Sequence, residues 1–207
     1  MESLELRAVS RIYTDAHGAP FRALDAVSLS WRQRDAIAIM GESGSGKSTL
    51  VNLVPNFYSA TKGQVLIDGV NADEYDRAAL LSAVSVVPQK AVLFEGTIRS
   101  NLLMGNPNAS EAELFSALET AQAAEIVRTK PNGIDEPVLR GGSNFSGGQK
   151  QRLSIARALV HGGRILILDD SASALDFATD AKLRAAIRKL SPAPTTFIVS
   201  QRAASVM

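Results

Sequence analysis

The stretch Gly41-Glu42-Ser43-Gly44-Ser45-Gly46-Lys47-Ser48-Thr49 decides the fold class of this chain. It matches the pattern G-x-x-x-x-G-K-[ST], in which glycines let successive backbone N–H groups turn toward an anion. An apolar run at 37–40 precedes it, and a segment typical of a helix follows at 50–54. A flexible glycine loop alone would not explain why Lys47 and Ser48 occupy the positions that the pattern requires after an apolar strand. The stretch therefore predicts a phosphate-binding loop between a strand and a helix.

Each residue type in the loop has a chemical task. Backbone N–H groups point at phosphate oxygens, the Lys47 ammonium reaches the terminal phosphates, and the Ser48 hydroxyl is a ligand for Mg²⁺. We therefore expect a nucleotide with Mg²⁺ as the bound group, and the loop alone leaves many classes of enzyme open. The residues expected to bind it here are Gly41, Ser43, Gly44, Ser45, Gly46, Lys47, Ser48 and Thr49.

The pattern around the loop predicts an α/β fold. Short runs that are almost entirely apolar, at 36–40, 84–87, 165–168 and 195–199, are typical of parallel strands buried on both faces. Alternating stretches at 3–6 and 26–29 predict strands with one buried face. Strands that alternate with helical stretches indicate a mostly parallel sheet, and residues 97–160 read as a mostly helical insertion.

Two helices of this pattern have clear sequence signals. Ser110-x-x-Glu113 is a capping box, and it opens a helix with Leu114, Leu118 and Ala121 on one face. Leu183, Ile187 and Leu190 form a similar stripe in a later helix.

A second glycine-rich helix start lies at Ser146-Gly147-Gly148-Gln149. Ser146 is a natural N-cap, and the glycines leave backbone N–H groups able to meet an anion. Alone, this would be an ordinary capped helix. It stands, however, shortly before the apolar run at 165–168, which ends in Asp169, an acid that can hold Mg²⁺.

With these motifs the chain resembles the ABC transporter ATPase family along essentially its whole length. The family signature is LSGGQ, and position 145 here is Phe instead of Leu. The resemblance implies a P-loop NTPase (RecA-like) core at 1–90 and 160–207 that includes an antiparallel β subdomain, with a helical subdomain at 91–159. Family cassettes continue beyond the equivalent of Met207, so we expect further domain sequence there.

The resemblance also implies roles for residues outside the loop. Tyr13 stands at the place of the adenine-stacking aromatic, and Gln89 matches the Q-loop glutamine, which touches Mg²⁺ and links the site to the membrane domain. The segment at 94–102 looks like that of exporters more than importers. Ser173-Ala174-Leu175-Asp176 matches the D-loop.

In the family, two cassettes pair head to tail, and each ATP lies between one phosphate loop and the partner's signature. On that arrangement Ser146, Gly147, Gly148 and Gln149 serve a nucleotide bound to the other chain. The resemblance further implies transmembrane domains on the same polypeptide and a position on the cytoplasmic face of the membrane.

Two residues depart from the family pattern at the expected catalytic centre. Asp170 replaces the usual glutamate base and is one methylene shorter, and Gln201 replaces the switch histidine and cannot carry a proton. Together with Gln89 they are the expected catalytic residues. We therefore expect a slow site and a different chain as partner, one that supplies Glu and His. Arg140 stands where an acid precedes the glycines of the X-loop, and we interpret it as a solvated charge.

Composition excludes several other classes. The 207 residues carry a net charge of +1 and no cysteine, so neither a nucleic-acid surface nor a disulfide scaffold is indicated. No apolar run reaches the roughly 20 residues of a membrane helix. Three alternatives remain: an ABC ATPase of DNA repair, which would need a long coiled coil, a regulatory subunit that only clamps ATP, and a small P-loop kinase, which would leave the signature without a task.

Overall fold

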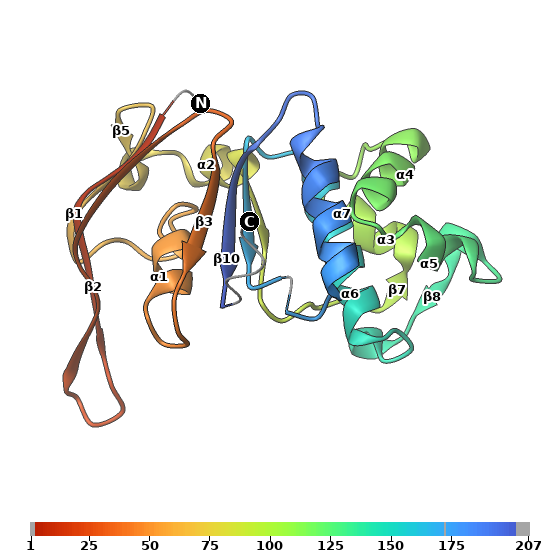
Figure 1. Cartoon of the computed structure of the whole chain (residues 1–207), viewed down its shortest axis with the longest axis horizontal. Helices are drawn as coiled ribbons and strands as arrows, with labels where there is room; N and C mark the ends of the chain where they lie inside the picture. Colours follow the sequence, from red (N-terminus) through yellow and green to blue (C-terminus); the bar gives the residue numbers. More distant parts are fainter. Residues whose placement is uncertain (1–2, 172, 202–207) are drawn as a thin grey trace.

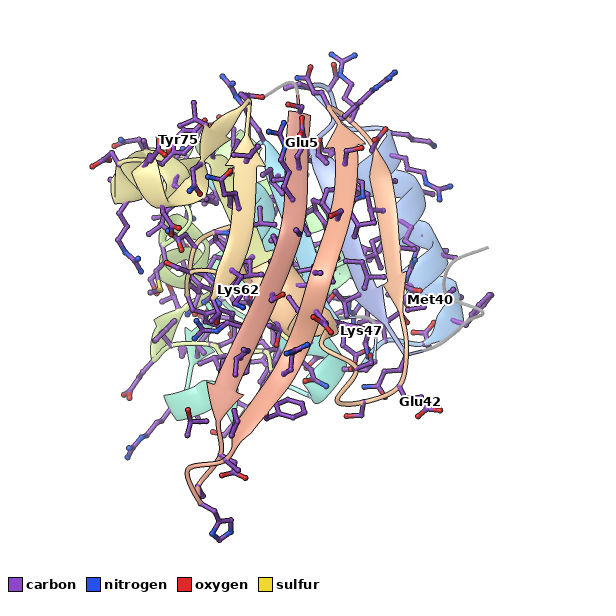
Figure 2. All side chains as sticks on the ribbon, turned by 90° about the vertical axis from the view of Figure 1, so that its left-hand side faces the viewer. Glu5, Met40, Glu42, Lys47, Lys62 and Tyr75 are labelled. Carbon is purple, nitrogen blue, oxygen red and sulfur yellow. The ribbon has the colours of Figure 1, made fainter. Side chains whose placement is uncertain are left out.

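The computed structural model describes residues 3–171 and 173–201 and arranges them as an antiparallel sheet, a parallel sheet and a group of helices (Figure 1). The antiparallel sheet has the order β2-β1-β4-β5. Its strands are β1 (Ser3–Thr14), β2 (Pro20–Arg32), β4 (Lys62–Ile67) and β5 (Val70–Asn71). β1 and β2 form a long hairpin, seen from its outer side in Figure 2.

The second sheet is parallel throughout, with the order β3-β10-β9-β6. Its strands are β3 (Ala36–Met40), β6 (Val84–Val87), β9 (Ile165–Asp169) and β10 (Thr195–Ser200). Ile165 and Ile167 of β9 belong to the apolar cluster shared with the antiparallel sheet, whereas Leu166 and Leu168 belong to the cluster under the helices. Because successive side chains of a strand point to opposite faces, both faces of β9 are buried. The predicted α/β class with a mostly parallel sheet is confirmed.

One expectation about this sheet was wrong. We expected β3 to be buried on both faces, but it forms an edge of the sheet, and Met40 is 54% exposed. Ala36 and Ala38 are exposed as well. An apolar composition by itself does not distinguish an edge strand from a central one, because the neighbours of a strand are set by distant segments.

The helical group follows the sequence signals closely. It contains α3 (Ile98–Leu103), α4 (Glu111–Thr120), α5 (Ala124–Arg128) and α6 (Gly147–His161), with the small ladder of β7 (Gly96–Thr97) and β8 (Pro137–Val138) beside them. Ser110 and Glu113 form the predicted capping box, and Leu114, Leu118 and Ala121 are buried as predicted. Phe145, the departure within the signature, is buried in the same cluster, and Lys130 lies over its ring.

The remaining helices join the two sheets to this group. They are α1 (Lys47–Asn52), α2 (Arg77–Ala83) and α7 (Phe177–Arg188), and short 3-10 turns lie at Ala72–Glu74, Gly133–Asp135 and Arg140–Gly142. Arg140 is exposed, as its interpretation as a solvated charge requires. Among the described residues, no helix has the length and apolar character needed to cross a bilayer.

Candidate nucleotide-binding site

The carboxyl ends of all four parallel strands converge on one cavity of about 260 Å³. Because the strands are parallel, the loops that follow them meet at the same edge of the sheet, where open α/β sheets bind ligands. The hairpin of β1 and β2 supplies the outer wall. The cavity brings together the predicted residues Tyr13, Ser43, Gly44, Gly46, Lys47, Ser48, Thr49, Gln89, Asp169, Asp170 and Gln201.

The loop after β3 has a backbone that only glycine accepts at one point. Gly46 has φ +88°, and a Cβ there would lie 2.5 Å from the backbone oxygen of Ala23. Gly46 is also the N-cap residue of α1. Because glycine has no side chain, no side-chain oxygen accepts the first N–H groups of this helix. The loop therefore presents backbone donors to whatever anion lies in front of it.

Lys47 lies within the curl of this loop (Figure 2). Its ammonium donates to the backbone oxygens of Gly41, at 2.7 Å, and of Glu42, and to Ser45 Oγ at 3.2 Å. Gly41 and Ser45, which do not line the cavity, thus hold the lysine. An ammonium held by carbonyl and hydroxyl oxygens can exchange them for phosphate oxygens, which bind it more strongly.

Ser48 and Asp169 together offer the ligands that Mg²⁺ prefers. Ser48 Oγ donates to Asp169 Oδ1 at 3.0 Å. Two oxygens that bind one octahedral Mg²⁺ at adjacent positions are about 3 Å apart, so the spacing of this pair is compatible with the ion. Burial raises the pKa of Asp169, as does the neighbouring Asp170, whereas Ser48 and Lys47 oppose the rise. A bound cation would relieve that cost.

Asp170 is held by both glutamines of the site. Gln89 Nε2 donates to Asp170 Oδ2 at 3.2 Å, and Gln201 Nε2 donates to the same oxygen at 3.3 Å. The backbone of Asp170 is equally constrained, with φ +45° and its N–H donating to the oxygen of Val199 at 3.1 Å. The carboxylate is thus fixed at the end of β9, with one oxygen occupied by two amides.

Tyr13 lines the cavity but is engaged by its own neighbours. The Arg11 guanidinium lies 4.7 Å from the centre of the Tyr13 ring, and the Tyr58 ring meets Tyr13 edge to face. Burial raises the pKa of the Tyr13 hydroxyl, but hydrogen bonds from Tyr58, Thr49 and Arg11 outweigh it and lower that pKa. Burial, followed by the bond to Tyr13, raises the pKa of Tyr58 to about 12.

Phe21 is a wall residue that the sequence reasoning missed. It stands directly opposite Tyr13 in the register of the hairpin and lines the same cavity. The alternation in β2 together with the register of the hairpin could have identified it, but β1 and β2 are offset by irregularities between residues 6 and 12, and the sequence does not reveal these.

The signature residues lie outside this cavity. Ser146 is exposed and caps α6, with Gln149 N donating to Ser146 Oγ at 3.3 Å and Ser146 N donating to Gln149 Oε1 at 2.9 Å. Gly147 has nothing within 4 Å of a Cβ, and a Cβ on Gly148 would lie 3.0 Å from the Ala174 oxygen. The start of α6 and the loop between β3 and α1 lie on the same side of the molecule, the lower side in Figure 1.

A larger cavity, of about 520 Å³, lies near the opposite ends of the parallel strands, where Arg164 precedes β9 and Pro194 precedes β10. It contains none of the predicted phosphate-binding residues. Size therefore does not locate the site here, whereas the converging loops do.

A sequence model of the family described as ABC transporter matches residues 24–173, which include the phosphate loop, the signature and both aspartates. The chain belongs to the ABC transporter family. It is an ATP-binding domain close to exporter-type homologues, and such domains bind ATP, normally with Mg²⁺, and are generally ATPases.

The individual relatives agree with this assignment. An uncharacterized ABC transporter ATP-binding protein of Bacillus subtilis is 38% identical over 204 residues, covering 99% of this chain and 35% of that protein. A putative multidrug export ATP-binding/permease protein of Staphylococcus aureus is 39% identical over 203 residues, covering 98% of this chain and 35% of that protein. The chain thus spans 35% of the length of these curated relatives.

Among solved structures, a bacterial Atm1-family ABC exporter with ATP bound is similar to the chain, with a TM-score of 0.91 and 33% sequence identity. The match covers 99% of this chain and 35% of the exporter chain.

Proposed function

We propose that this chain is the ATP-driven motor domain of an exporter and that it dimerises head to tail around Mg-ATP. One observation carries the proposal: the exposed start of α6 at Ser146 lies outside the chain's own nucleotide cavity but on the same side of the molecule. In this position it could meet a nucleotide that is bound to a second cassette. ATP bound between the two surfaces would hold the dimer, and hydrolysis would release it.

In this proposal each predicted residue keeps its role. The loop residues and Tyr13 bind the nucleotide, Ser48, Gln89 and Asp169 hold Mg²⁺, and Asp170 and Gln201 face the attacking water. Mg²⁺ would supply charge neutralisation on the phosphate oxygens. Ser146–Gln149 act toward the partner's nucleotide.

The chain's own site would turn ATP over slowly. Asp170 is short, and its Oδ2 already accepts hydrogen bonds from Gln89 and Gln201, so that oxygen would have to give up one of these donors to accept a hydrogen bond from an attacking water. Gln201 can donate to a phosphate but cannot carry a proton. We therefore propose a heterodimer in which a different chain supplies Glu and His and completes a competent site against Ser146 of this one.

A surface groove formed in part by β6 and α6 supports attachment to transmembrane domains, which we propose to be on the same polypeptide. Exposed Phe57, Phe94 and Met104 line a groove of about 300 Å³. Arg157 crosses the groove, donates to the Val92 oxygen and lies over the Phe94 ring. Exposed apolar side chains gathered in a groove are typical of a protein interface.

The proposal also gives the position and the subdivision of the domain. The domain would lie on the cytoplasmic face of the membrane, with core segments at 1–90 and 160–207, a helical subdomain at 91–159 and no nucleic-acid partner.

A double substitution tests the slow site. Asp170→Glu with Gln201→His is expected to raise ATP turnover at least about 10-fold, because a positioned general base contributes roughly 10²- to 10⁴-fold. Each single variant and a Lys47→Ala background show whether the gain comes from this cavity. Phosphate release per chain, at equal nucleotide occupancy, is the measurement.

A second candidate, a subunit that binds ATP only to clamp its partner, is favoured by the same pair of residues. A mixture with a partner cassette that carries Glu and His distinguishes the two. A motor half raises turnover above that of either chain alone and loses this gain when Ser146 is changed. Turnover equal to the sum of the separate chains, with the paired state verified, would contradict the heterodimeric motor.

A further inference from the structure

One large apolar side chain stands apart on the surface of the molecule. Phe177, the first residue of α7, is 67% exposed, which is the largest exposed fraction among the large apolar side chains of residues 3–171 and 173–201. Within the same residues, neither another aromatic ring nor a cation packs on its ring. Leaving a phenylalanine in water forgoes the benefit of burying it, so this position calls for a physical explanation.

The start of α7 does not depend on this ring. Asp176 caps the helix: its Oδ1 accepts from Thr179 N at 2.9 Å, and its Oδ2 accepts from Thr179 Oγ1 at 2.7 Å. Leu175 before the cap and Leu183 within the helix are both buried in the cluster under the helices. A helix that is capped and anchored in this way would also form with a small polar residue at its first position. The local structure therefore gives the ring no task.

The ring stands beside the exposed start of α6. A Cβ on Gly148, in the first turn of α6, would lie 3.0 Å from the Ala174 oxygen, so this turn adjoins the loop that leads into α7. The two helix starts lie together on the lower side of the molecule in Figure 1. Much of this face consists of small exposed residues: Ser146, Gly147, Ser173, Ala174 and Ala178. Phe177 is thus a single large ring among small side chains.

Aromatic side chains are enriched at the buried centres of protein interfaces, where they bring a large contact area and few rotatable bonds. We propose that Phe177 is a partner-selecting residue, which packs on an apolar surface of the second cassette when the pair closes. The inference rests on the dimer put forward under the proposed function, and it adds which partner is accepted. A cassette with a charged side chain opposite Phe177 would lose the hydration of that charge and be rejected.

Sedimentation in Mg-ATP tests this contact, with the 207-residue chain alone and mixed with a cassette that carries Glu and His. Phe177→Ser should weaken dimerisation at least about 10-fold and leave the ATP affinity of the single chain within about 2-fold, because Phe177 does not line the nucleotide cavity. Phe177→Leu should keep part of the dimer affinity. Phe177→Glu should lose more than Phe177→Ser, since a carboxylate would be buried against an apolar surface.

Phe57→Ser is the matched control. Phe57 is also an exposed phenylalanine, at 47%, but it lies in the groove formed in part by β6 and α6. Its replacement should leave dimerisation unchanged. Phe177→Trp adds a second measurement: its emission should shift to shorter wavelength in Mg-ATP, and the shift should grow with protein concentration and be absent in a Lys47→Ala background. The unchanged chain, which contains Trp31, is the reference for this emission.

The outcomes separate this proposal from the one on which it rests. Unchanged dimerisation in Phe177→Ser, or an equal loss in Phe57→Ser, would overturn the role of Phe177 and leave the dimer intact. A clear fall in the melting temperature of nucleotide-free Phe177→Ser would show that the ring packs within its own chain, which would also overturn that role. If the unchanged chain bound ATP but formed no dimer, either alone or in the mixture, the proposed dimer would be wrong, and the role of Phe177 with it.

Discussion

Helices α1 and α6 both begin at glycine-rich segments, yet the two starts are completed in different ways. At α1 the N-cap is Gly46, in a left-handed conformation and without a side-chain cap. At α6 the N-cap is Ser146, which forms a reciprocal capping box with Gln149. No side chain caps the first start, whereas at the second the Ser146 hydroxyl accepts one of the helix N–H groups, that of Gln149.

This difference separates the tasks of the two segments. In the proposed function a single chain binds a nucleotide at α1, because loop residues, Lys47 and the Ser48–Asp169 pair lie in one cavity. In the proposed dimer, a phosphate of the partner's nucleotide would approach a helix start at which the Gln149 N–H is already bound to Ser146, so its exact position would decide which N–H groups it reaches. Dimerisation is therefore expected to be selective for a correctly seated nucleotide.

The largest effect should come from exchanging glycine for alanine at each start. Gly46→Ala is expected to lower the free energy of unfolding by about 2–4 kcal/mol, because φ +88° is costly for alanine and its Cβ would meet the Ala23 backbone. Gly147→Ala should be neutral or stabilise by up to about 1 kcal/mol, since open space surrounds it in a helix. Urea unfolding without nucleotide measures the free energy of unfolding of both variants. Equal losses of stability would contradict the difference between the two helix starts.

An intermediate effect is expected from removing the cap of α6. Ser146→Ala should cost about 1 kcal/mol of stability and leave ATP binding by the single chain unchanged. Dimerisation in Mg-ATP, followed by sedimentation, should weaken at least about 10-fold. Ser110→Ala removes the same kind of capping box from α4 and is the matched control. If it impaired dimerisation equally, the effect would be general instability and not loss of a phosphate contact.

The smallest effect concerns the charge at the α1 cavity. The pKa of Asp169 is raised in the folded chain by burial, so its charged form costs stability at neutral pH. Asp169→Asn, without nucleotide and with EDTA, should therefore melt slightly higher than the unchanged chain at pH 7. The advantage should shrink as the pH falls through the raised pKa toward the ordinary aspartate value. A lower melting temperature for Asp169→Asn at pH 7 would contradict the expectation that the buried charge of Asp169 lowers the stability of the folded chain.

The elements with local signals could be predicted from the sequence. The phosphate loop, the capping boxes at Ser110 and Ser146 and the stripe of Leu114 and Leu118 all depend on residues a few positions apart. The position of β3 could not, because an edge strand and a central strand have the same apolar composition. Phe21 was missed for a related reason: its place opposite Tyr13 depends on the register of an irregular hairpin.

The sequence by itself determined the chemical groups available to this protein: a glycine loop expected to bind phosphates, a hydroxyl and a carboxylate expected to bind Mg²⁺, and a second capped helix start. Only the tertiary structure decided that Gln89 and Gln201 share one oxygen of Asp170, and that Arg11 covers Tyr13 while Phe21 stays exposed. These contacts join residues brought together by strand order and register. Strand order and register are set by the packing of the whole sheet, which no short stretch of sequence contains.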